Sequence, residues 1–223
     1  MTYDFDTPVD RSGTYSLKWE EAGDALPMWV ADMEFQTAPQ IRAALQQRLD
    51  HGIFGYSIVP PAWNQAYVDW WHRRHNLDID PESLVFSTGV VPAISSMVRK
   101  LTTANENVLI QTPVYNIFFN SIINNGCRVL ESPLEYDGSG HYSINWADLE
   151  SKLADPQTTL MILCNPHNPV GRIWDRDTLA RIGELCWNHH VTVISDEIHC
   201  DLTDPGYDYV PFASVNEQCA MNS

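Results

Sequence analysis

Short apolar runs alternate with longer helical patterns from about residue 84 onward, and this alternation constrains the fold more than any other feature. Such a pattern is typical of parallel βαβ units, so we predict an α/β fold with a parallel-rich sheet between helices. The predicted strands are residues 84–87, 108–111, 128–131, 160–164 and 191–195. The predicted helices between them are residues 91–101, 115–125, 146–153 and 176–189.

Two further helices are expected upstream, at residues 38–51 and 61–75. The second carries Trp63, Tyr67, Trp70 and Trp71 on or near one face, and core packing is the main explanation for such a cluster. Residues before 38 have no strong periodicity and are interpreted as an arm or as part of a second domain.

The balance of charges argues against nucleic acid as a partner. Lys and Arg number 13 and Asp and Glu 29, which gives a formal net charge of −16. Binding to a phosphate backbone needs clustered basic residues, and the acidic excess would repel it. We interpret the acidic residues as a solvated surface.

The cysteines and the N-terminus favour a cytoplasmic setting. The five cysteines are odd in number and form no CxxC pair, so we expect neither disulfides nor a metal site. The first residues have no basic segment followed by an apolar one, and no apolar run is long enough to cross a membrane.

Polar and aromatic residues follow the predicted strands, where parallel sheets bind their ligands. Four such segments converging on one sheet edge predict a binding site. They lie at residues 88–91, 112–115, 165–171 and 196–199.

Asp196 and Asn168 are the strongest candidates in these segments. Asp196 ends an apolar strand, where a carboxylate is costly unless a cation such as a protonated pyridine lies opposite it. A helix N-cap is an equally good interpretation of Asp196 alone. Asn168 lies between prolines, which favour extended backbone and an outward-facing amide that can donate to a phenolate oxygen.

Three further segments could contribute, although each also has an ordinary structural explanation. The turn into the helix at Val90 and Val91 presents free backbone N–H groups suited to a phosphate, or is a plain strand-helix turn. Tyr115 could stack on a flat ligand or pack internally. Tyr56 lies in a glycine-flanked turn that could simply be tight.

Taken together, these residues resemble the pyridoxal-phosphate (PLP) enzymes of fold type I, and within them the cystathionine β-lyases and related C–S lyases of the class I/II aminotransferase family. The resemblance extends over nearly the whole chain. It is carried by PMWVADM at residues 27–33, GIFGYS at 52–57, NPHNPVG at 165–171 and SDEIH at 195–199.

The resemblance implies an incomplete PLP-binding large domain at residues 46–223. Residues 1–45 would form an N-terminal arm and part of the small domain. Asp196 would pair with the pyridinium nitrogen, with Asn168 and His199 beside the phenolic oxygen. Tyr115 would stack on the ring.

The same resemblance assigns the remaining contacts. The backbone of Val90 and Val91 would hold the phosphate. Tyr56 would reach the phosphate or substrate of a neighbouring subunit, which implies a homodimer. Val30 and Ala31 would line the side of the site that binds the carboxylate of an amino-acid substrate.

The implied reaction is β-elimination from a cystathionine- or cysteine-type amino acid, giving pyruvate, ammonia and a thiol. It requires a Schiff-base lysine. The chain has only Lys18, Lys100 and Lys152, which we interpret as solvated surface residues, so that lysine is expected beyond Ser223. These 223 residues alone should not turn over substrate.

Three alternatives remain open. An aminotransferase of the same fold would use almost the same cofactor contacts. A lysine-free chain could instead be a non-catalytic interaction module or a gene remnant. A Rossmann-type nucleotide binder is disfavoured because the glycine fingerprint is missing.

Overall fold

The computed structural model describes residues 3–223, and the chain divides into two compact units at residues 1–58 and 59–223. This division separates the parts of the chain that pack within themselves. The predicted boundary after residue 45 concerns which residues belong to a small domain, and it stays a prediction.

Residues 3–58 of the first unit form two helices and an ion pair whose lysine is buried. They are α1 (Leu17–Glu20) and α2 (Pro39–His51). Lys18 is only 7% exposed, and its Nζ donates to Glu34 Oε1 at 2.7 Å and to the Asp32 carbonyl at 2.9 Å. Our interpretation of Lys18 as a solvated residue was therefore wrong, because pairing with Glu34 lets the ammonium be buried.

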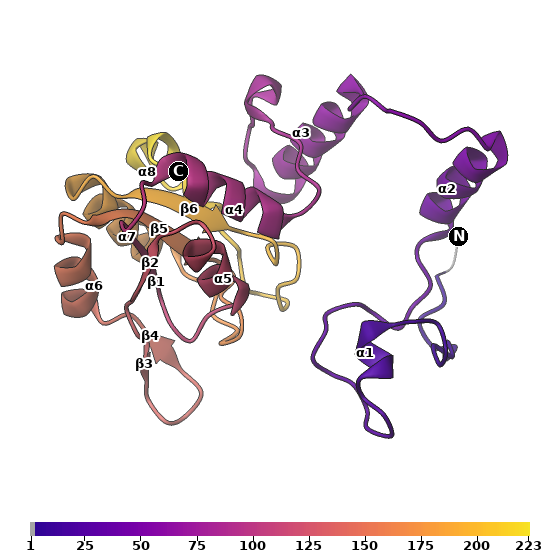
Figure 1. The fold of residues 1–223 in the computed structure, drawn as a ribbon, viewed down its shortest axis with the longest axis horizontal. Coiled ribbons are helices and arrows are strands. Elements are labelled where there is room, and N and C mark those ends of the chain that lie inside the picture. Colours follow the sequence, from indigo (N-terminus) through magenta and orange to yellow (C-terminus); the bar gives the residue numbers. More distant parts are fainter. Residues whose placement is uncertain (1–2) are drawn as a thin grey trace. The chain divides into compact units, whose positions relative to one another are not determined.

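The second unit is built on a four-stranded parallel sheet in the order β2-β1-β5-β6 (Figure 1). Its strands are β1 (Asn107–Ile110), β2 (Arg128–Glu131), β5 (Thr158–Cys164) and β6 (Thr192–Asp196). A small antiparallel hairpin of β3 (Glu135–Tyr136) and β4 (Tyr142–Ser143) was not predicted. The predicted α/β class with a parallel sheet is confirmed.

Helices cover both faces of this sheet. Helices α4 and α5 pack on one face, with Ile94 and Phe118 at the contact, and α6 and α7 pack on the other, with Leu149 and Leu179. The helices of this unit are α3 (Pro61–His75), α4 (Val90–Leu101), α5 (Ile117–Ile123), α6 (Trp146–Leu153), α7 (Arg176–Asn188) and α8 (Glu217–Met221). Two short 3-10 helices occupy Pro81–Ser83 and Phe212–Ser214.

Local sequence explains where several of these helices begin. The side chains of Asn145, Asp175 and Asn216 accept backbone N–H groups of the first turns of α6, α7 and α8. Each such cap contributes about 1 kcal/mol to helix stability. Strand β5 is buried along nearly its whole length because helices cover both of its faces, which explains its continuous apolar sequence.

Residues 84–87 do not form the predicted strand. They lie in no helix or strand, and Val85 is 87% exposed. A strand requires a hydrogen-bonding neighbour, and no described segment pairs with these residues. Apolar, β-branched composition reports only that a strand is compatible with the sequence.

The aromatic cluster of α3 is also less buried than expected. Trp71 is buried, whereas Tyr67 and Trp70 are about 40% exposed, at 39% and 41%. The rings form a chain along the helix, with centroid distances of 5.8 Å from Trp63 to Tyr67 and 6.0 Å from Tyr67 to Trp71. Most of this face is therefore an aromatic array at the surface of the unit.

Within residues 3–223, no helix is both long enough and apolar enough to cross a membrane.

The contact between α7 and α8 gives a first prediction. Gly183 lies inside α7, where alanine would ordinarily stabilise a helix by about 0.5–1 kcal/mol. A Cβ at this position would overlap the sulfur of the buried Cys219. Gly183→Ala should therefore lower the free energy of unfolding by about 1–3 kcal/mol, as measured by urea denaturation.

The double variant Gly183→Ala/Cys219→Ala is the matched control. It removes the sulfur, and the remaining Cβ of residue 219 lies 3.8 Å away, so much of the lost stability should return. A Gly183→Ala protein as stable as the parent would contradict this packing.

Candidate cofactor site

The carboxyl ends of β5 and β6 lie side by side. Cys164 and Asp196 are partners in the parallel register, and the Asn165 N–H donates to the Asp196 carbonyl at 3.0 Å. Partners in a parallel register face the same side of the sheet. Their side chains therefore point toward the face covered by α4 and α5, where Cys164 and Ile194 belong to the same core cluster.

Asp196 is a buried carboxylate with little compensation. It is 6% exposed, its Oδ1 accepts the Ile198 N–H at 3.2 Å, and within residues 3–223 no basic side chain forms an ion pair with it. Burial raises the pKa of Asp196, against the opposing effects of the Ile198 N–H and of His199. The N-cap interpretation was wrong, because a turn rather than a helix follows Asp196.

Asn168 and His199 line one groove of about 540 Å³ in the second unit. The Asn168 N–H also donates to Cys164 Sγ at 3.4 Å, which ties this loop to the end of β5. Residues 168–171 form a turn closed by a bridge between His167 and Arg172. The groove shows that the loops after β5 and β6 present polar side chains to the same space.

The two candidates from other loops pack near these strand ends. Val90 and Tyr115 are partly buried against the core cluster that contains Cys164 and Ile194. Tyr115 also makes an edge-to-face contact with Phe118 at 5.9 Å. The ring therefore packs internally on one side and keeps part of its surface exposed.

Helix α4 begins at this edge without a side-chain cap. Its N-cap is Gly89, which has no side chain, and Val91 at the second helical position is 39% exposed. The first N–H groups of a helix have no acceptor within the helix, so those of Val90 and Val91 are suited to an anion.

The remaining three candidates belong to the first unit. Val30 is partly buried, Ala31 is exposed and Tyr56 is fully exposed. The structure describes the two units separately, so the roles of these three residues stay predictions.

Two residues near the site are more important than the sequence suggested. Glu197 accepts the Ser195 hydroxyl and the Phe212 N–H, each at 2.8 Å, and burial raises its pKa. His167 is 2% exposed, and its Nε2 lies 3.0 Å from the Pro113 carbonyl. They connect the loops after β6 and β5 to segments distant in sequence.

No lysine of the described residues supplies an amine beside Asp196 within the second unit. Lys100 lies at the C-terminal end of α4, about 15 Å along the helix from the end that meets the site. We expected Lys152 to be a solvated surface residue, but its ammonium pairs with Asp148 at 2.8 Å and contacts the Glu131 carbonyl at the end of β2. Strand β2 is two strands away from β5.

Comparison with known proteins establishes the family. The model of the aminotransferase class I and II family matches residues 27–220, and the chain belongs to this family. Within it, the chain is similar to cystathionine β-lyases and C–S lyases. It is 48% identical to the cystathionine β-lyase PatB of Bacillus subtilis over 97% of this chain and 57% of that protein. It is 36% identical to the protein MalY of Escherichia coli over 96% of this chain and 56% of that protein.

Solved structures agree with this assignment. A PLP-bound putative aminotransferase from Clostridium difficile superposes with a TM-score of 0.94 at 44% identity, over 99% of this chain and 58% of that one. Cystalysin from Treponema denticola, which contains PLP, superposes with a TM-score of 0.93 at 36% identity, over 100% of this chain and 58% of that one. The predicted PLP fold type I is thus confirmed, and the chain spans a little over half the length of these relatives.

The raised pKa of Asp196 predicts a stabilising substitution. A carboxyl whose pKa is higher in the folded state stabilises the fold below its unfolded pKa of about 3.9, and this contribution is lost as the pH rises through the folded pKa. Asp196→Asn, measured without cofactor, should therefore raise the free energy of unfolding at pH 7 by about 1 kcal/mol.

The pH dependence makes this prediction specific. The difference between the parent and Asp196→Asn should shrink as the pH falls through the raised folded pKa of Asp196, and be smallest below about pH 3.9, where the carboxyl is protonated in both the folded and the unfolded state. Asp177→Asn is the control, because Asp177 is an exposed acid in the first turn of α7. A loss of stability at pH 7 in the Asp196 variant would contradict the account.

Proposed function

We propose that this chain forms the cofactor-holding part of a PLP-dependent carbon–sulfur β-lyase. The observation that supports it most is the buried Asp196 carboxylate, which has no ion-pair partner among residues 3–223. A protonated pyridine nitrogen would supply the missing positive charge. The similarity to PatB and cystalysin favours a lyase over other family activities.

The chemistry of the available groups fits each part of the cofactor. Asp196 would hold a proton on the ring nitrogen, because a carboxylate in a low-dielectric site strongly favours an adjacent cation. Asn168 and His199 would donate hydrogen bonds to the phenolic oxygen. When bound, PLP supplies the electron sink for chemistry at the substrate Cα, which no protein side chain can provide.

The remaining contacts come from the rim of the sheet and from the first unit. Val90 and Val91 would donate backbone N–H groups to the phosphate, and Tyr115 would lie against the ring. The fully exposed Tyr56 is free to reach the site of a second subunit, so we propose that the working protein is a homodimer. Val30 and Ala31 would border the carboxylate of the substrate.

The proposed substrate is an amino acid that carries a thiol or thioether at Cβ, such as cystathionine or cysteine. Its products would be pyruvate, ammonia and a thiol. The alternative reaction is amino transfer to a keto acid by the same cofactor contacts. His199 favours the lyase mildly, because many aminotransferases of this fold carry tyrosine at the matching position. The five buried, unpaired cysteines suit the cytoplasmic setting expected from the sequence.

Cofactor binding can be tested on the 223 residues themselves. Because no lysine lies at the site in the second unit, the chain should bind PLP non-covalently, and borohydride should not fix it stoichiometrically to Lys100 or Lys152. Asp196→Asn should weaken binding at least about tenfold in equilibrium dialysis, since the pyridinium loses its counter-charge.

Asp177→Asn again serves as the control with the same loss of charge. Equal affinity of the parent and the Asp196→Asn variant would show that this carboxylate does not contact the ring nitrogen. It would remove the main support for the cofactor assignment.

The reaction must be tested on a polypeptide that contains these residues together with a lysine in the site. Incubation with cystathionine and PLP should release pyruvate without any added keto acid. Transfer of the amino group to a keto acid, with little pyruvate formed from the substrate, would instead assign the protein to the aminotransferases. If the naturally expressed polypeptide neither binds PLP nor turns over substrate, a non-catalytic role would be favoured.

A further inference from the structure

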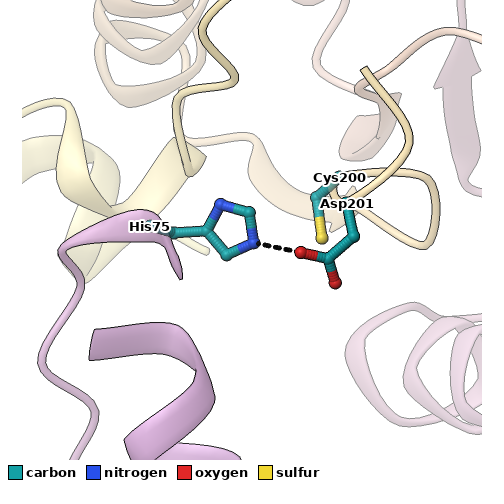
Figure 2. A group of neighbouring side chains, drawn as sticks. All are labelled: His75, Cys200 and Asp201. Atoms are coloured by element: carbon teal, nitrogen blue, oxygen red, sulfur yellow. Dashed lines mark hydrogen bonds and ion pairs between the residues drawn. The ribbon is translucent and has the colours of Figure 1, made fainter. Parts of the chain in front are cut away.

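Three side chains able to bind a metal meet where the C-terminal end of α3 approaches the turn that follows β6. His75 lies at the C-terminal end of α3, and Cys200 and Asp201 lie in the turn (Figure 2). His75 Nε2 lies 3.0 Å from Oδ1 of Asp201, and the ligand atoms of all three residues lie within 4.8 Å of one another. The set offers one nitrogen, one sulfur and one oxygen.

The histidine is held in place by its surroundings. Its side chain is 6% exposed. The ring contacts the rings of Trp71 at 4.8 Å and Tyr209 at 5.2 Å, so two aromatic neighbours fix its orientation. Packing of this kind reduces the entropy that a ligand loses when it binds a metal.

The carboxylate is also oriented by a second contact. Oδ2 of Asp201 accepts the indole N–H of Trp70 at 3.0 Å, in the manner of outer-shell hydrogen bonds that orient metal ligands. Arg74 Nε lies 3.4 Å from Oδ1, but this side chain is half exposed and can turn into solvent. The net charge of −16 and the neighbouring Glu197 favour a cation in this region.

We propose that His75, Cys200 and Asp201 form a binding site for a divalent transition metal of the zinc class. Nitrogen and sulfur donors select zinc, cobalt or nickel over magnesium and calcium, which prefer oxygen ligands. A tetrahedral ion would take a water as its fourth ligand. Bond lengths of about 2.0–2.3 Å require the most widely separated ligand atoms to approach by about 1 Å, which rotation of the Cys200 and Asp201 side chains can provide.

Binding has a defined proton balance. Burial raises the pKa of the Cys200 thiol to about 11, so the free thiol is protonated at neutral pH and must release its proton to solvent when the metal binds. His75 binds through neutral Nε2, so a proton on this atom is released or moves to Nδ1. No oxidant or reductant takes part.

A metal at this position would connect α3 to the turn directly behind Asp196. It would therefore stabilise the second unit and hold the β6 turn in place. This site does not depend on the proposed lyase activity, because none of its three ligands contacts the cofactor in that proposal.

The spacing of the ligands explains why the sequence predicts no metal site. His75 is separated by more than 120 residues from the adjacent Cys200 and Asp201, and no CxxC or HxxxH motif joins them. Only the fold brings them together.

Cobalt is the direct probe. The tag-free 223-residue chain is titrated with Co²⁺ and should show thiolate-to-cobalt charge transfer in the near ultraviolet at one ion per chain, with Zn²⁺ displacing it. Cys200→Ala should abolish the charge-transfer band. His75→Gln and Asp201→Asn should each weaken Co²⁺ binding more than about tenfold.

Two control variants and one independent measurement complete the test. His72→Gln alters an exposed histidine on the same helix, and Cys127→Ala alters a buried cysteine elsewhere, so both should bind cobalt like the parent. In the parent, one equivalent of Zn²⁺ should slow iodoacetamide labelling of Cys200 more than that of Cys127, because Cys127 gains only the stability of the unit whereas the Cys200 sulfur is also bound. Both sites are measured by mass spectrometry under partly denaturing conditions. This comparison needs no variant to fold.

Three results would overturn the proposal. They are the absence of a cobalt–thiolate band in the folded parent, a band that persists in Cys200→Ala, and zinc protection that is equal at Cys200 and Cys127.

Discussion

The candidate site depends on a carboxylate that is buried at the end of a strand and has no counter-ion in the part of the chain that the structure describes. Asp196 is 6% exposed, and among residues 3–223 its side chain accepts one hydrogen bond, from the Ile198 N–H. An isolated charge in such a position is costly, and here the cost appears as a raised pKa. A cationic ring nitrogen beside Asp196 would lower this pKa again. Each tenfold change in the acid dissociation constant of the carboxyl corresponds to about 1.4 kcal/mol of coupling between carboxylate and cofactor.

The surrounding structure holds this carboxylate in position. Register with Cys164 fixes the end of β6 against β5, and the Asn165 N–H bonds the Asp196 carbonyl. Glu197, the next residue, is anchored by Ser195 and by the backbone of Phe212. Packing and hydrogen bonds on both sides of Asp196 thus hold its unfavourably buried carboxylate in place. Such an arrangement is common where function opposes stability.

Local periodicity allowed most of the second unit to be predicted. Residues 146–153 and 61–75 were predicted with the bounds that the helices have, and four of the five predicted strands were found within two residues of their ends. Residues 84–87 failed because strand formation depends on a neighbour that the local sequence does not specify. The prediction that Tyr67 and Trp70 pack in the core failed for the same reason, because an aromatic face indicates a contact but not which segment makes it.

The candidate site was predicted less completely than the fold. Asp196, Asn168 and His199 could be selected because they follow strands whose carboxyl ends share one edge, and the structure brings these three toward one region. Glu197, His167 and the pair formed by His75 and Asp201 were missed, because each gains its importance from a partner 15 to 126 residues away. No sequence spacing reports such contacts.

The most direct test of the account is the protonation state of the cofactor nitrogen. PLP labelled with ¹⁵N in the ring would be bound to the 223-residue chain and its nitrogen shift recorded by NMR at pH 8. The account predicts the shift of a protonated pyridinium in the parent and of a neutral pyridine in Asp196→Asn. A neutral nitrogen in both proteins, or a protonated one in both, would contradict the role given to Asp196.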